Sequence, residues 1–188
     1  MTPALAVLLA CGGDVPQLDA DGPDLVGVTV EVMVQPEPIV MQLGSAWIEE
    51  DGGHGVGASA SVPPDLIIEG DTSSWSLSDG RVVFQGHVTV TRPPVTVSCA
   101  KLVVTYADDH VDLAVATGDV VVRRGERVAR GEHAVLEPVT GRVVLTGSPM
   151  INDGPRTLSG DRIELFLDDE RLECSGCRLV VEGSAVTP

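Results

Sequence analysis

The chain has 188 residues, enough for one domain with a hydrophobic core, and 43% of them are hydrophobic although only 3% are aromatic. Its formal net charge of −16 is uneven, because residues 1–80 contain 13 acidic and no basic side chains, whereas residues 81–188 contain 15 acidic and 12 basic ones. Such a chain is poorly suited to nucleic acid, since it cannot neutralise a run of phosphates, and no apolar run reaches the roughly 20 residues of a membrane-spanning helix.

The first eleven residues have the character of a signal-like leader. Residues 4–10 are small and aliphatic and end in Leu8-Leu9-Ala10-Cys11, which resembles a bacterial lipobox. The resemblance implies that Cys11 is lipidated and anchors the protein to a membrane. The alternative is a frayed apolar tail on a cytosolic protein. Residues 12–24 are rich in Asp, Gly and Pro and are predicted to form a flexible tether.

Alternating apolar residues predict strands from residue 25 onward. In residues 26–34 every second residue is valine, so these valines share one face of a predicted strand, and residues 40–48 predict a second strand with Gly44 at a bend. Residues 49–64 contain most of the loop signals and are interpreted as a strand interrupted by an insertion. The spacing of 26 residues from Gly44 to Gly70 fits either two steps of 13 or one step with an insertion.

A repeated corner organises the rest of the chain. An alternating apolar stretch enters a glycine and leaves as another such stretch at Gly86, Gly118, Gly147 and Gly176, with spacings of 32, 29 and 29 residues. A second corner lies 13 residues after each of the first three, and its column holds Gly70, Cys99, Gly131 and Gly160. A fixed period indicates stacked copies of one unit, here two short strands that meet at a bend. The predicted fold is therefore all-β, a repeat-built folded sheet with open edges.

Residues at equal offsets from the corners are apolar, and offsets that differ by two place them on one face of each strand. These columns are predicted to line the space between two arms of the folded sheet. The predicted lining residues are Trp75, Val82, Phe84, Val88, Val90, Leu102, Val104, Val122, Leu136, Val143, Leu145, Ile151, Ile163 and Leu165. A Val-, Ala- and Leu-rich lining suits a slot for hydrocarbon, and it suits an ordinary aliphatic core equally well.

Other candidate chemistry is weak. Cys174-Ser175-Gly176-Cys177 straddles a corner, and we interpret it as a possible disulfide that closes the bend, because no second ligand pair accompanies it for a metal or redox site. The four histidines lack metal-ligand spacing, and the paired acidic residues are interpreted as turn formers rather than calcium ligands. No nucleophile–base set is apparent. The sequence therefore predicts no enzyme activity, no metal and no cofactor.

The repeat as a whole resembles the OstA-like (LptA/LptC) family of lipopolysaccharide export proteins. The resemblance rests on residues 113–122 (LAVATGDVVV), 129–134 (ARGEHA), 140–149 (TGRVVLTGSP) and 158–163 (LSGDRI). It implies a periplasmic β-jellyroll domain over residues 25–183, with residues 184–188 as a tail. It also implies that lipid A acyl chains lie between the two sheets and that neighbouring jellyroll subunits of the export bridge pair edge to edge.

The same resemblance implies a phosphorylated ligand. Its phosphates are expected near one or more of seven basic residues of the second half, namely Arg81, Arg92, Lys101, Arg123, Arg124, Arg127 and Arg130. Two other functions remain open at this point. One is a structural β-solenoid that serves assembly without a lipid ligand, and the other is a repeat-built carbohydrate-active enzyme. A lipid-filled slot distinguishes the first hypothesis from both.

Overall fold

The computed structural model describes residues 7–11, 25–32, 39–62, 65–107, 110–137, 140–166 and 171–182, which form β-strands and turns. The long strands are β1 (Val7–Cys11), β2 (Leu25–Val32), β3 (Ile39–Glu49), β4 (Gly52–Val62), β5 (Leu66–Ser76), β6 (Arg81–Arg92), β7 (Val95–Ala107), β8 (His110–Arg124) and β9 (Arg127–Glu137). The short ones are β10 (Arg142–Thr146), β11 (Met150–Asp153), β12 (Arg156–Ser159), β13 (Arg162–Phe166), β14 (Leu172–Ser175) and β15 (Arg178–Val181). The predicted all-β, repeat-built fold is confirmed. Among the described residues, no helix has the length and hydrophobicity that crossing a bilayer requires.

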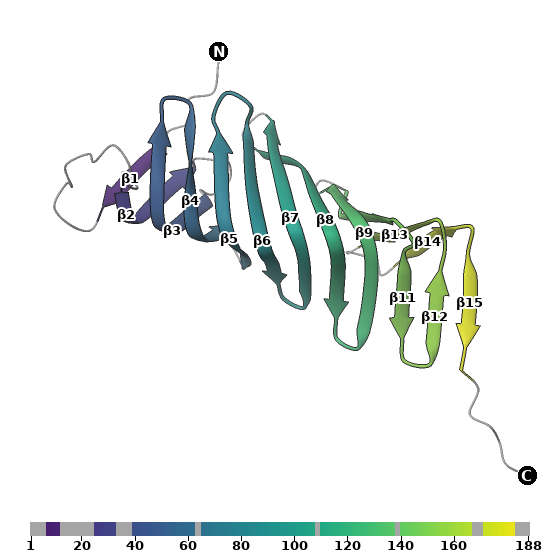
Figure 1. Cartoon of the computed structure of the whole chain (residues 1–188). Coiled ribbons are helices and arrows are strands. Elements are labelled where there is room, and N and C mark those ends of the chain that lie inside the picture. The colour runs from purple at the N-terminus through teal and green to yellow at the C-terminus, as the bar shows by residue number, and fades with distance from the viewer. Residues whose placement is uncertain are drawn as a thin grey trace, which may run out of the picture.

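The strands form one antiparallel sheet in which each strand from β1 to β9 pairs with the next along the chain. One end of β9 pairs with β10 and its other end with β11. Beyond β9 the sheet divides into two sets of short strands, β10–β13–β14 and β11–β12–β15. Figure 1 shows β11, β12 and β15 side by side while β13 and β14 run off at an angle near their upper ends. The sheet is therefore folded along a line rather than flat.

A row of corners crosses the sheet along this fold line. The sequence predicts first-corner glycines and second-corner residues. They lie on neighbouring strands and together form this single row. At Gly86 and Gly118, the glycine and the residue after it face one residue on the neighbouring strand, which produces a bulge in the register. A bulge adds a residue to one strand, so the strand bends and its twist increases. The bend divides the sheet into two arms. The lower arm comprises residues 88–99 and 120–131 with β11, β12 and β15. The upper arm comprises residues 71–85 and 101–117 with β10, β13 and β14.

The corner backbone explains why glycine occupies the first-corner position. Gly118 has φ of +80°, and Asp119 after it has φ of +46°, so two consecutive residues are left-handed. A Cβ on Gly118 would lie 2.7 Å from the Cβ of Ala100 on the neighbouring strand, closer than two carbon atoms can pack. The left-handed backbone disfavours a side chain at Gly118, and the close approach of the neighbouring strand excludes one.

The N-terminal strands continue the same corner row, which settles the spacing between Gly44 and Gly70. The pairing of β3 with β4 places Gly57 beside Gly44, so the interval consists of two steps of 13 residues. The predicted insertion in residues 49–64 was wrong, because β4 is continuous. The predicted common face of residues 26–34 was also wrong in part. Gly27 has φ of +64° at the bend, and Val26 before it is 69% exposed whereas Val28 after it is buried.

The hydrophobic core lies between the two arms. One inward row near the bend runs across neighbouring strands from Ser73 on β5 to Cys174 on β14. Its members are Ser73, Phe84, Leu102, Ala116, Ala134, Leu145, Ile163 and Cys174. The core is continuous from Val28 on β2 to Ile163 on β13. Two adjacent alanines, Ala116 and Ala134, lie between the larger pairs Phe84–Leu102 and Leu145–Ile163, which lets the facing arm approach closely there.

The last corner carries a disulfide between Cys174 and Cys177, on either side of Gly176. The bond closes the bend between β14 and β15, which pair with different strands, β13 and β12. It therefore joins the last strand of the upper arm to the last strand of the lower arm. Cys99 is a buried free cysteine in the corner row.

We expect replacement of Gly118 by alanine to destabilise the protein by about 2–4 kcal/mol, because it adds a clash with Ala100 to the left-handed strain. Gly125 is the matched control, since its φ is +60° and a Cβ there would contact nothing within 4 Å. Gly125→Ala should cost only about 1 kcal/mol. Urea unfolding followed by circular dichroism measures both. Equal losses would show that the close approach to Ala100 is unimportant.

Replacing Cys174 and Cys177 by serine should lower the free energy of unfolding by about 2 kcal/mol, because the bond closes a short loop and restricts the unfolded chain only modestly. Hydrogen exchange should increase in β14 and β15 more than in β6 and β7. The control is Cys99→Ala, which removes a thiol but no cross-link. Uniform exchange across the sheet would contradict a local role for the disulfide.

Candidate binding slot between the two arms

The bend directs the inward rows of the two arms toward one another. Eleven of the fourteen predicted lining residues are buried, and Val90, Leu136 and Leu165 are partly buried against the same core. The structure thus places all fourteen on the inward face. Most of them pack against protein in this state, so their contact with a ligand stays a prediction.

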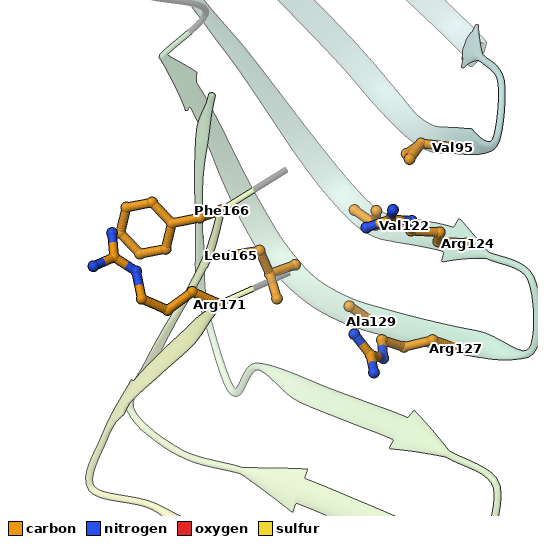
Figure 2. A pocket seen from close by; sticks show the side chains of 8 residues that line it. All are labelled: Val95, Val122, Arg124, Arg127, Ala129, Leu165, Phe166 and Arg171. Carbon is orange, nitrogen blue, oxygen red and sulfur yellow. The ribbon is translucent and has the colours of Figure 1, made fainter. Parts of the chain in front are cut away.

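A cavity opens between the arms near β8, β9 and β13. It has an empty volume of about 440 Å³, which includes solvent at its open side. It is lined by Val95, Val122, Arg124, Arg127, Ala129, Leu165, Phe166 and Arg171. In Figure 2, Leu165 and the strands that carry Val122 and Ala129 lie across the cavity from one another. Two predicted lining residues, Val122 and Leu165, are therefore brought together here by opposite arms.

The floor of the cavity is apolar and its edges carry guanidinium groups. Val95, Val122 and Ala129 come from the lower arm, where they extend the inward rows toward the hairpins that end this arm. On the upper arm, the guanidinium of Arg171 lies 3.8 Å from the centre of the Phe166 ring. Such a contact holds the ring and the cation in one orientation. The site can therefore accept an apolar chain and an anionic group close together.

Sequence reasoning did not identify Phe166 and Arg171 as cavity residues. Leu165 points inward, so strict alternation assigns its neighbour Phe166 to the outer face. Phe166 is the last residue of β13, and its backbone N–H donates to the carbonyl of Arg171. In Figure 2 the Phe166 ring and the Arg171 side chain lie on the side of β13 away from Val122 and Ala129, so both residues border the cavity while the ring keeps the outer orientation that alternation assigns.

The cations near the cavity are partly balanced. Arg127 donates from Nη2 to Asp153 Oδ2 at 2.9 Å and from Nε to the same oxygen at 3.2 Å. Arg124 lies directly opposite Arg127 on the neighbouring strand. Like charges at directly opposite positions destabilise a sheet unless an anion lies near both. Asp153 pairs with Arg127, and the local charge of these three residues remains positive.

The outer face of the upper arm has a different electrostatic character. Arg142 donates to Glu137 at 2.6 Å and to Glu164 at 3.0 Å, and Arg162 contacts Glu164 at 2.9 Å. The hydrogen bond from Arg142 lowers the pKa of Glu137 below its ordinary value. Acidic partners therefore satisfy these outer arginines, which lie away from the cavity.

Ser73 is the polar exception in the inward row. Its residue is 3% exposed, and its hydroxyl has no hydrogen-bond partner among the described residues. It faces Phe84 on the neighbouring strand. A buried hydroxyl without a partner costs about 1–3 kcal/mol.

The remaining predicted sites are only partly covered. The backbone of Cys11 ends strand β1 and pairs with Val28. Its side chain, the predicted tether of residues 12–24 and the predicted tail of residues 184–188 lie outside the described residues. Within the described ranges, no three His, Cys, Asp or Glu side chains gather so that they could hold a metal ion.

Replacement of Ser73 by alanine should raise the free energy of unfolding by about 1–2 kcal/mol, because it removes the unpaired hydroxyl and keeps the strand. Ser74→Ala, at the exposed neighbouring position, should change the stability by less than about 0.5 kcal/mol. Thermal and urea unfolding would measure the difference. A loss of stability in Ser73→Ala would mean that the hydroxyl has a partner in solution.

Comparisons with known proteins identify the fold and the family. No curated protein matches the chain in sequence. The structure is similar to the crystal structure of LptH from Pseudomonas aeruginosa, the LptA homologous periplasmic component of the lipopolysaccharide transport device, with a TM-score of 0.57 and 14% identity over 63% of this chain and 95% of that chain. The profile of the family described as LptA/(LptD N-terminal domain) LPS transport protein matches residues 67–171, which is more than half of the chain. The corner repeats, the folded sheet and this match together place the chain in the LptA/(LptD N-terminal domain) family of LPS transport proteins.

Proposed function

We propose that this protein is a periplasmic component of a lipopolysaccharide transport bridge that binds lipopolysaccharide without chemical conversion and holds its acyl chains between the two arms. The observation that carries the proposal is the cavity in which Val122 and Leu165 approach from opposite arms over an apolar floor. Membership of a lipopolysaccharide transport family supports the ligand class. The proposed role is non-enzymatic, and transport energy comes from other components.

An aliphatic slot is suited to a ligand that has to move on. Burial of acyl chains contributes free energy in proportion to the apolar area removed from water, and it imposes no directional contact. A chain can therefore slide along the inward rows without breaking specific hydrogen bonds. The corner row extends these inward rows across the sheet from β2 to β14, so the proposed slot follows the long direction of the molecule.

The sheet edges are the proposed contacts with neighbouring jellyroll subunits. At the C-terminal edge, β14 pairs with β13 and β15 pairs with β12, and neither has a second neighbour among the described strands. Leu179, Val180 and Val181 on β15 are 60%, 44% and 57% exposed. Exposed backbone and apolar side chains on one edge favour the addition of a strand from another subunit.

Lipidation of Cys11 is the proposed means of membrane attachment. Cleavage before Cys11 would remove four of the five residues of β1, and β2 would then become the N-terminal edge. In this proposal, processing exposes a strand edge for a partner while it creates the anchor. Mass spectrometry of the mature N-terminus identifies whether Cys11 carries lipid.

The slot is tested with a photo-crosslinking amino acid placed at Val122 and, as a matched control, at Val121. These neighbours on β8 lie on opposite faces, because Val122 is buried in the core and lines the cavity. We expect lipopolysaccharide to be cross-linked at position 122 at least about tenfold more than at position 121. Equal yields, or no adduct in a folded protein, would instead favour a structural assembly module with a dry interior.

A further inference from the structure

The structure sorts the basic residues of the chain by face. Alternation and register place Arg81, Lys101, Arg123 and Arg130 on the outer face, because Val82, Leu102, Val122 and Ala129 beside them are buried inward. The same reasoning places Arg92, Arg124 and Arg127 on the inward face. The seven positions from which the sequence could not choose a phosphate contact are thereby reduced to three.

The inward arginines lie in one row at the end of the lower arm. Cross-strand pairs connect Arg92 to Val95, Val95 to Arg124, Arg124 to Arg127 and Asp153 to Arg156. The register of β9 with β11 continues the row from Arg127 to Asp153. We call this the arginine rim, and its members are Arg92, Val95, Arg124, Arg127, Asp153 and Arg156. In Figure 1 it lies at the hairpins that end β6, β8 and β11, at the bottom of the molecule.

The composition of the rim is unusual for this chain. Four cations and one anion share the row, while the whole protein has a formal net charge of −16. Some rim charges are balanced, because Arg127 binds Asp153 at 2.9 Å and Arg92 lies 3.8 Å from Asp65. The row next to the rim along the strands, with Val122, Ala129 and Ile151, is buried and apolar. The buried apolar row and the arginine row are therefore two residues apart along each strand.

We propose that the arginine rim, through Arg124 and Arg127, binds the phosphate groups of an amphiphile whose acyl chains occupy the slot. This inference rests on the proposed function and adds a selectivity element to it. Arg124 and Arg127 lie on neighbouring strands and both line the cavity, so one phosphate can accept hydrogen bonds from both guanidinium groups. Arg171 borders the same cavity, but its guanidinium lies over the Phe166 ring and 3.8 Å from Glu173, so the proposal uses only Arg124 and Arg127.

Position and chemistry distinguish this rim from a solvated charged edge. A surface charge row gains little from being aligned with an apolar row, whereas an amphiphile needs both within the length of its headgroup. The outer arginines Arg142 and Arg162 are held by the carboxylates of Glu137 and Glu164. Carboxylates therefore already bind these two outer arginines, whereas the rim row holds four arginines and one carboxylate.

The test compares Arg124→Gln/Arg127→Gln with the control Arg123→Gln/Arg130→Gln. Both pairs lie on β8 and β9 and remove two charges, but from opposite faces. The ligands are bis-phosphorylated lipid A and the same lipid without phosphates, measured by displacement of a fluorescent fatty acid at low and high salt. We expect the rim variant to lose about tenfold or more of the wild-type preference for the phosphorylated lipid, and the control to keep it.

Two further measurements separate the possible results. Arg124→Lys/Arg127→Lys retains the charge and should keep part of the preference, and inorganic phosphate should compete weakly, since it lacks acyl chains. An unchanged preference in the rim variant, or competition by inorganic phosphate as strong as by the lipid, overturns the inference. Wild-type protein that binds both lipids equally also overturns it and leaves the proposed function intact. Wild-type protein that binds neither lipid overturns both.

Loss of folding in the variants is measured separately from lipid binding. Circular dichroism and thermal unfolding of the glutamine variants show whether the sheet is intact, and the salt dependence of wild-type binding needs no variant. We expect salt to weaken wild-type binding of the phosphorylated lipid and to leave the dephosphorylated lipid almost unaffected, because charge contacts are screened and apolar contacts are not. Equal salt dependence for both lipids contradicts a phosphate site on the rim.

Discussion

The fold depends on the close approach of neighbouring strands at the corner row. At Gly118 the backbone is left-handed, and the side chain of Ala100 on the next strand lies where a Cβ would be. The corresponding space is taken by Glu132 at Gly147 and by Asp161 at Gly176. Each corner bends one strand, but the corners lie side by side, so the whole sheet bends along one line. Without this bend the two arms would not face each other and the apolar rows would have no partner.

The same bend separates two kinds of surface. On the outer face of the upper arm, Arg142 is held between Glu137 and Glu164, and its hydrogen bond lowers the pKa of Glu137. On the inward face, the arginine rim follows directly after buried apolar rows. The two faces differ by one residue along each strand. A strongly acidic protein can therefore place cations next to the apolar rows of its inward face.

The proposed transport role uses three features of one repeated unit. The inward rows supply an apolar path, the rim supplies contacts for a phosphorylated headgroup, and the outermost strands supply edges for further subunits. Addition of a subunit at an edge continues both the sheet and its bend, so the path can extend beyond one molecule. The disulfide between Cys174 and Cys177 fixes the bend at the C-terminal edge, where a continuing strand would need both arms in place.

The sequence by itself determined the strands from residue 66 onward, the corner glycines from Gly86 to Gly176, the 29-residue period and the inward set from Trp75 to Leu165, because alternation and turn chemistry are local. Only the tertiary structure decided that Gly57 is a corner, that Val26 faces solvent and that Phe166 and Arg171 border the cavity. It also divided the basic residues between the faces. These outcomes depend on register, on bulges that shift alternation and on strand ends, which are set by pairing with residues far along the chain.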